Sequence, residues 1–118
     1  MEVHFEDEPS FLVARAAGSF SLEGMIATFE KTAAVARARG ARRVLFDAAA
    51  ITGDLPDLDR YDLGKRAAEV FAHIERLAVV RPANVRYTGF AFDVAQNRGL
   101  DARAFLDPKA AADWLQNP

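Results

Sequence analysis

Apolar residues follow two different periods along this chain, and segments of the two kinds alternate. The strands are predicted over residues 2–6, 11–17, 44–47, 77–80 and 103–106. The helices are predicted over residues 21–39, 59–74, 87–97 and 108–116. Only a turn separates the first two strands, which therefore form an antiparallel hairpin. The later strands alternate with helices and should run parallel through right-handed crossovers.

Local signals mark where the predicted helices begin and end. Ser21 is a good N-cap for the first helix, and Gly40 suits the left-handed residue that closes it. Asp59 is expected to cap the second helix, and Asp107 followed by proline marks the start of the last one. Gly64 lies inside the second helix, where glycine costs about 1 kcal/mol relative to alanine. We therefore expect a neighbouring element to approach closely at this position.

The composition is that of one soluble domain over residues 1–118. Apolar residues make up 51% of the chain, which is enough for a core, and the net charge of −2 predicts no binding to nucleic acid. The absence of cysteine excludes disulfides, thiolate catalysis and zinc–cysteine sites. The N-terminus does not resemble a signal peptide, and no apolar run reaches the length of a membrane span. We therefore predict a cytoplasmic protein that does not bind membranes.

The central strand, 44–47, brings Asp47 to an irregular acidic stretch, 48–58, that has no clear period. Ligands of α/β sheets bind where strands end. The residues near the ends of the third and fourth strands are therefore the candidates for binding a ligand or a partner. They are Asp47, Thr52, Asp54, Arg60, Tyr61 and Arg81.

Each of these candidates also has a structural interpretation. Asp47 could orient a substrate or a hydroxyl group, but the favoured interpretation is that it caps backbone amides of the following loop. Arg60 and Arg81 could hold a carboxylate or a phosphate in bidentate fashion. The favoured alternative is a salt bridge to a nearby acid, Asp57, Asp59 or Asp62.

The sequence contains no pattern that identifies a catalytic, metal or cofactor site. The two histidines, His4 and His73, are far apart in the sequence, and no serine lies in a nucleophile elbow. The aspartates of residues 54–62 do not have the spacing of a calcium loop. We therefore predict no catalytic residue, no metal and no cofactor.

Short motifs follow one another in a recognisable order over nearly the whole chain, most clearly over residues 43–116. They are Leu45-Phe46-Asp47 with a loop closing at Gly53, Arg60-Tyr61-Asp62-Leu63-Gly64, Ala78-Val79-Val80, Ala95 with Asn97-Arg98-Gly99, Arg103-Ala104-Phe105, and Ala111 with Trp114-Leu115. In this order they resemble the STAS family, and more narrowly the bacterial SpoIIAA-like proteins that are also described as STAS-like or CRAL-TRIO-like. The resemblance implies an α/β fold with a five-stranded mixed sheet: an antiparallel N-terminal hairpin, then three parallel strands, with four helices mostly on one face.

The resemblance also bears on regulation and assembly. Regulatory members of the wider family switch by phosphorylation of a serine after the third strand. Here residues 48–51 are Ala-Ala-Ala-Ile and the hydroxyl of this loop belongs to Thr52, so the switch is not expected. Helices on one face would leave the second face of the sheet uncovered, and its apolar strands then predict a homodimer.

Three functions remain as hypotheses. The first is a non-catalytic regulatory or protein-interaction module whose residues 48–62 face the partner. The second is a small-molecule binding protein that holds an anionic or lipid-like ligand near Asp47. The third and least favoured is an enzyme that uses Asp47 as a base. A pocket beneath residues 48–58 would favour the second, a flat exposed apolar surface the first, and a carboxylate with a raised pKa in a cleft the third.

Overall fold

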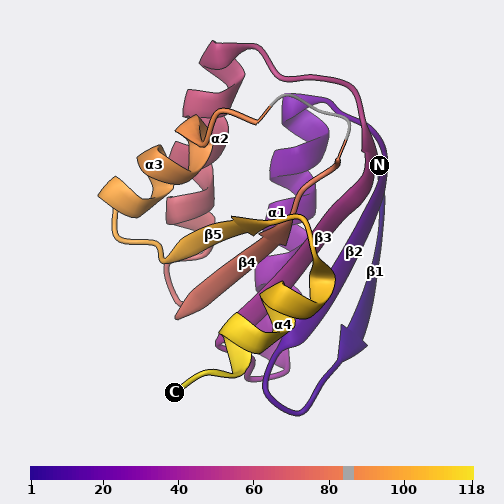
Figure 1. Cartoon of the computed structure of the whole chain (residues 1–118), viewed down its shortest axis with the longest axis vertical. Coiled ribbons are helices and arrows are strands. Elements are labelled where there is room, and N and C mark those ends of the chain that lie inside the picture. Colours follow the sequence, from indigo (N-terminus) through magenta and orange to yellow (C-terminus); the bar gives the residue numbers. More distant parts are fainter. Residues whose placement is uncertain (84–86) are drawn as a thin grey trace.

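The computed structural model describes residues 1–83 and 87–118, in which strands and helices alternate (Figure 1). The strands are β1 (Glu2–Asp7), β2 (Leu12–Ser19), β3 (Arg43–Thr52), β4 (Arg76–Val80) and β5 (Ala102–Phe105). The helices are α1 (Leu22–Ala38), α2 (Asp57–Val70), α3 (Phe90–Asn97) and α4 (Pro108–Gln116). The order of elements predicted from the apolar periods is confirmed.

The strands of the described residues form one sheet in the order β1-β2-β3-β4-β5. β1 pairs antiparallel with β2, from Glu2 opposite Ala17 to Asp7 opposite Leu12. The pairs β2–β3, β3–β4 and β4–β5 are parallel. Each parallel connection contains a helix, because a parallel neighbour can be reached only by a long crossover. The predicted five-stranded mixed sheet is confirmed.

The first and last helices begin where the sequence predicts. The Ser21 hydroxyl accepts a hydrogen bond from the backbone N–H of Gly24 at 3.0 Å. The Asp107 carboxylate accepts one from the N–H of Lys109 at 3.0 Å, with proline at the first helical position. Gly40 follows α1 with a φ of 69°, a conformation that glycine adopts without steric strain. These caps satisfy backbone groups that a helix end leaves without partners.

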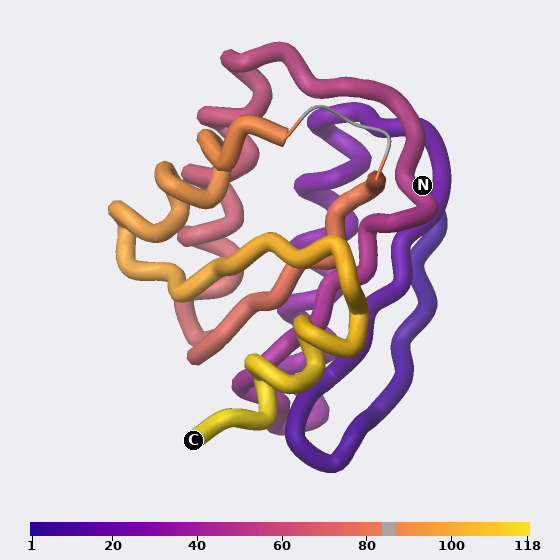
Figure 2. The backbone as a smooth tube through the Cα atoms, in the orientation of Figure 1, coloured from indigo at the N-terminus to yellow at the C-terminus, as the bar shows by residue number. Residues whose placement is uncertain are grey.

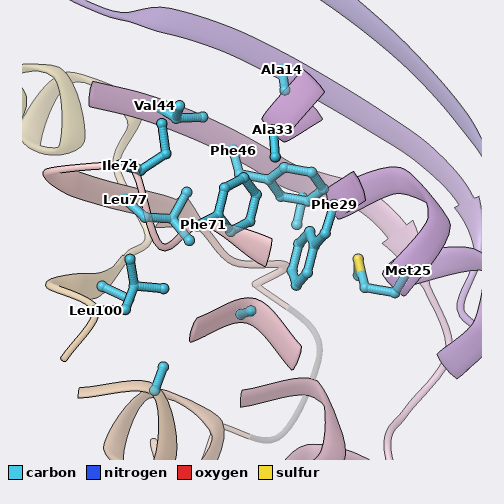
Figure 3. Close-up of a cluster of buried hydrophobic side chains, with 14 of the residues drawn as sticks. Ala14, Met25, Phe29, Ala33, Val44, Phe46, Phe71, Ile74, Leu77 and Leu100 are labelled. Carbon is cyan, nitrogen blue, oxygen red and sulfur yellow. The ribbon is translucent and has the colours of Figure 1, made fainter. Parts of the chain in front are cut away.

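The larger core lies between one face of the sheet and the helices α1, α2 and α3. Phe29 of α1 packs edge-on against Phe46 of β3, with ring centroids 5.0 Å apart, and against Phe71 at 5.3 Å. Figure 3 shows these three rings together, with Val44 and Leu77 of the neighbouring strands beside them. Edge-on aromatic pairs stabilise a core by about 0.5–1.5 kcal/mol beyond the area they bury. This cluster fixes α1 and the end of α2 on the same face.

The second core lies on the opposite face, where α4 crosses the sheet (Figure 1). Ala111 and Leu115 of α4 are fully buried there against strand residues that include Leu45 and Ala78. The expectation of helices mostly on one face is therefore confirmed, with α4 as the exception. Because α4 covers apolar residues of this face, the reason given above for expecting a homodimer is removed.

Two arginines hold the end of α4. Arg43 donates to the carbonyl oxygens of Leu115 and Asn117 at 2.6 and 2.7 Å. Arg76 donates to those of Trp114 and Asn117 at 2.9 and 2.8 Å. The last carbonyls of a helix have no partner within the helix. The guanidinium groups supply that partner and fix α4 to β3 and β4.

The prediction of an irregular loop directly after Asp47 is wrong. β3 continues to Thr52, and Ala50, Ile51 and Thr52 pair with Ala17, Gly18 and Ser19 of β2. A run of small residues has no hydrophobic period, but β2 is long enough to provide hydrogen-bond partners for it. Beyond Thr52 the chain crosses the end of the molecule at which α1 begins (Figure 2), and Phe20 donates its N–H to the Thr52 carbonyl at 2.7 Å.

Three helix boundaries also differ from the prediction. α2 begins at Asp57 after Pro56, so Asp59 lies in the first turn and does not cap the helix. α2 ends at Val70, which places His73 in the turn that follows. α3 begins at Phe90, because Gly89 takes a left-handed conformation with a φ of 73° and interrupts the helix there.

Candidate functional site

A cavity of about 150 Å³ lies between the sheet and the helices α1, α2 and α3. Met25 and Phe29 of α1 form one wall, and Phe46 and Ala48 of β3 form the floor. Figure 3 shows Met25 beside the Phe29–Phe46 pair. Leu55, from the segment between β3 and α2, also lines it. A pocket beneath this segment is the feature expected of a small-molecule binding protein.

The cavity exists because the residues around it are unequal in size. Large side chains hold α1 against the sheet, whereas Ala48, Gly64, Ala95 and Ala102 contribute little or no side chain to the lining. Protein interiors normally contain few voids larger than a water molecule. The small residues therefore leave a space that the fold does not fill.

Gly64 also brings α2 and α3 together beside the cavity. A Cβ atom at position 64 would overlap the carbonyl oxygen of Ala91 and lie 2.9 Å from the Cβ of Val94. The close approach predicted at this glycine is confirmed, and the neighbour is α3. The contact fixes the helix whose first residues line the cavity.

Arg60 lies at the wall of the cavity but has carboxylate partners. Its side chain is 6% exposed and donates to Asp57 Oδ1 at 2.9 Å and to Asp54 Oδ1 at 3.0 Å. A buried guanidinium needs such partners, because an unpaired buried charge is strongly unfavourable. The predicted salt bridge to Asp57 is confirmed, and Asp54 joins it.

Arg81 lines the same cavity, but its contacts differ from those of Arg60. It follows β4, and its backbone N–H donates to the Phe105 carbonyl at 2.8 Å. Its guanidinium lies over the ring of Tyr87, 4.4 Å from the centroid. Within residues 1–83 and 87–118, no carboxylate forms an ion pair with it. The structure thus brings Arg60 and Arg81 to one cavity, and only Arg60 has a carboxylate partner among these residues.

Asp47 does not share this cavity, and the expectation that it lies with the arginines is wrong. Side chains alternate along β3, so Asp47 points to the α4 face while Phe46 and Ala48 point to the cavity. Its carboxylate accepts from Arg15 at 2.9 Å and from the backbone N–H of Ala49 at 3.0 Å. The favoured interpretation, in which Asp47 caps backbone amides of the following loop, is confirmed only in that it accepts from a backbone N–H, because Ala49 belongs to β3 and not to a loop.

Arg15 joins Asp47 to the N-terminal hairpin. It is 3.1 Å from the carboxylate of Glu6 on β1 and bonds Asp47 on β3. The hydrogen bond with Glu6, together with the charges of Glu6 and Asp47, raises the pKa of Arg15 above its ordinary value. This charged row occupies the part of the α4 face near the hairpin, where a water-exposed surface suits it.

The other candidates also have contacts outside the cavity. The Tyr61 hydroxyl accepts a hydrogen bond from Arg98 at 3.0 Å, and Thr52 donates to the Gly18 carbonyl at 3.4 Å. Sequence reasoning did not identify Met25, Phe29 and Ala48 as residues of a binding site, because apolar residues are expected in any core.

Three further observations concern the described residues as a whole. No group of three or more acidic or histidine side chains there could hold a metal ion. No helix among them has the length and apolar character to cross a membrane. Burial, with smaller contributions from the charges of Arg37 and Arg42, lowers the pKa of His73, which is not among the residues that line the cavity.

Comparison with known proteins identifies the fold. No family model matches the chain, and no curated protein shows significant similarity to it. The crystal structure of an uncharacterised protein of the DUF3478 family from Shewanella loihica PV-4, described as having a SpoIIAA-like fold, superposes with a TM-score of 0.53 at 20% identity. The match covers 97% of this chain and 92% of that one. The SpoIIAA-like fold indicated by the motifs is confirmed, and at this identity the likeness carries no function.

Proposed function

We propose that this chain, with its SpoIIAA-like fold, is a non-catalytic binding protein for a small, largely apolar molecule. The cavity of about 150 Å³ between the sheet and the helices carries the proposal. A well-formed apolar pocket with a few polar groups at its wall is the usual form of a small-molecule site. This is the second of the three sequence-based hypotheses, with the ligand placed away from Asp47.

The volume of the cavity sets the size of the ligand. An engineered apolar cavity of about 150 Å³ in another protein stays dry and binds benzene. A group of roughly six carbon atoms is therefore the part of a ligand that fits inside. The cavity cannot enclose a whole long-chain lipid, and we therefore propose a short lipid-like ligand.

The polar groups of the lining support binding rather than a reaction. The lining residues with polar side chains are Arg60, Arg81, Tyr87 and Thr88. An arginine stays protonated and cannot act as a general base. No carboxylate or histidine is among the described residues that line the cavity. These groups can orient a ligand, and we assign the site no catalytic step.

The test is an NMR titration with 1-hexanol, in which the dissociation constant is obtained from the shifted resonances. Ala48→Leu places a larger side chain in the cavity, and Ala50→Leu makes the same change at an exposed position of the same strand. We expect the unmodified protein and the Ala50→Leu variant to bind hexanol equally. The Ala48→Leu variant should bind at least tenfold more weakly. Equal binding by all three proteins, or no binding by any, would overturn the proposal.

A second candidate function is the regulatory or protein-interaction module. It is favoured by Leu58, in the first turn of α2, whose side chain is 72% exposed within the segment 48–62. An exposed large apolar residue is common on its own, but here it lies in the segment expected to face a partner. If this surface pairs two copies, light scattering will give twice the mass of 12.9 kDa, and Leu58→Ser will restore the monomer. A monomer at all concentrations would exclude this homodimer.

A further inference from the structure

The charge balance at the cavity wall distinguishes its two arginines. Arg60 is paired with Asp54 and Asp57, so an anion placed beside it would meet two carboxylates of the protein. Arg81 has no such neighbour among the ion pairs of the described residues. Among the residues that the structure describes, Arg81 is therefore the cation at this wall that an incoming anion can approach without displacing a carboxylate.

The environment of Arg81 leaves its donors accessible. A ring stacked on the face of a guanidinium contacts its π-system, and the N–H groups lie in the plane of the group. The Arg81 Cζ atom lies over the Tyr87 ring, 4.4 Å from the ring centroid. The stack orients the side chain, and the edge of the guanidinium can still bind a carboxylate with two parallel hydrogen bonds.

The residues that follow Tyr87 also favour the binding of an anion in the cavity. Thr88, Gly89, Phe90 and Ala91 line the same cavity and include the start of α3. The N-terminus of a helix carries a partial positive charge, which favours an anion by about 0.3–1 kcal/mol at exposed sites. The partial charge at the start of α3 contributes less to anion binding than the charge of Arg81, and both favour the anion.

We propose that the ligand is a monocarboxylate with a short apolar tail, held with its tail in the cavity and its carboxylate on Arg81. This inference rests on the proposed function and names the class of molecule that the site takes. A single negative charge fits better than a phosphate dianion, because Asp54 and Asp57 are paired with Arg60 behind the lining and the chain carries a net charge of −2. A tail of roughly six carbons follows from the cavity volume.

The test compares two probes that share a tail and differ in charge, hexanoate and 1-hexanol, by NMR titration at pH 7. The variants are Arg81→Gln, which removes the charge, and Arg81→Lys, which keeps the charge without the bidentate geometry. Arg103→Gln is the control, because Arg103 also stacks on an aromatic ring, Trp114 at 4.7 Å, but on the α4 face. Thermal unfolding of each variant shows whether it is folded before it is titrated.

We expect hexanoate to bind roughly tenfold more tightly than hexanol, as one charge-assisted contact predicts. Arg81→Gln should remove that advantage by weakening the binding of hexanoate far more than that of hexanol. Arg81→Lys should keep part of the advantage, and Arg103→Gln should change the binding of neither probe. If hexanol binds and hexanoate binds no better, the ligand class is wrong while the binding function stands. An Arg81→Gln variant that weakens both probes equally also overturns the inference, since it assigns Arg81 a structural role. Failure of both probes to bind overturns the inference and the proposed function together.

Discussion

Gly64 of α2 lies against the backbone carbonyl of Ala91 in α3, in a contact that leaves no room for a methyl group. The two helices border the cavity at this point, and Gly64 and Ala91 both belong to its lining. The contact therefore sets how far α3 stands from the rest of the protein. It connects the choice of one residue in α2 to the shape of the proposed binding site.

We predict that Gly64→Ala destabilises the protein by about 1–3 kcal/mol, as overpacking does. Helix propensity alone would favour alanine by about 1 kcal/mol, so the sign of the change separates the two effects. Urea denaturation measures it, with Lys65→Ala at the adjacent exposed position as the control. A Gly64→Ala protein that is more stable than the original would show that the contact yields without strain.

His73 should make stability depend on pH. Its pKa is lowered from the ordinary value of 6.5, chiefly by burial and then by the charge of Arg37, whose Nη2 lies 3.4 Å from the Nδ1 atom of His73. The unfolded chain therefore binds a proton at a higher pH than the folded chain does. Stability should be complete above pH 6.5 and should fall as the pH decreases through that value toward the folded pKa. Chemical denaturation at several pH values over this range gives the free energy of unfolding as a function of pH. This free energy should decrease with falling pH in the His4→Gln control, and it should decrease less steeply in His73→Gln.

The arginine contacts at the end of α4 should control how firmly that helix is docked. We expect Arg43→Gln to increase amide hydrogen exchange over residues 108–117, because the Leu115 carbonyl loses its arginine partner and the Asn117 carbonyl keeps only Arg76. Exchange in α1 should not change. Arg42→Gln, at the exposed neighbouring position, is the control. Unchanged protection of α4 in Arg43→Gln would show that the apolar contacts of Leu115 hold the helix without the arginine.

Asp47→Asn tests the assignment of Asp47 to the other face of the sheet. Its carboxylate is 16% exposed and bonds a half-exposed Arg15, so we expect a loss of stability of about 1 kcal/mol. Binding of hexanol and hexanoate should be unchanged, because Asp47 is absent from the cavity lining. A large loss of binding in a variant that remains folded would return Asp47 to the site.

Much of the fold follows from local signals in the sequence. Ser21 and Asp107 mark helix starts because their side chains accept backbone N–H groups, and this chemistry acts within a few residues. Gly64 indicated a close helix contact because glycine is otherwise unfavourable inside a helix. The continuation of β3 to Thr52 could not be predicted in the same way, because Ala48, Ala49 and Ala50 carry no period and their pairing depends on β2.

The site was less accessible to sequence reasoning. The pairing of Arg60 with Asp57 is local and was expected, but the face to which Asp47 points depends on the alternation of side chains along a strand whose length was underestimated. The cavity lies between α1, β3 and α3. Its presence depends on how these elements pack together, which a pattern along the sequence does not show. Arg81 was a candidate because it ends a strand, and only the structure distinguishes it from Arg60.

The two methionines of the chain allow the most direct test of the cavity as a ligand site. Met25 lines the cavity, whereas Met1 lies at the surface against Thr28, with 3.4 Å between the Thr28 hydroxyl and the Met1 sulfur. We predict that hexanoate, titrated into protein labelled with ¹³C at the methionine methyl groups, shifts the Met25 resonance to saturation and leaves Met1 unchanged. A Met25 resonance that stays fixed, or that moves only in parallel with Met1, would contradict the account.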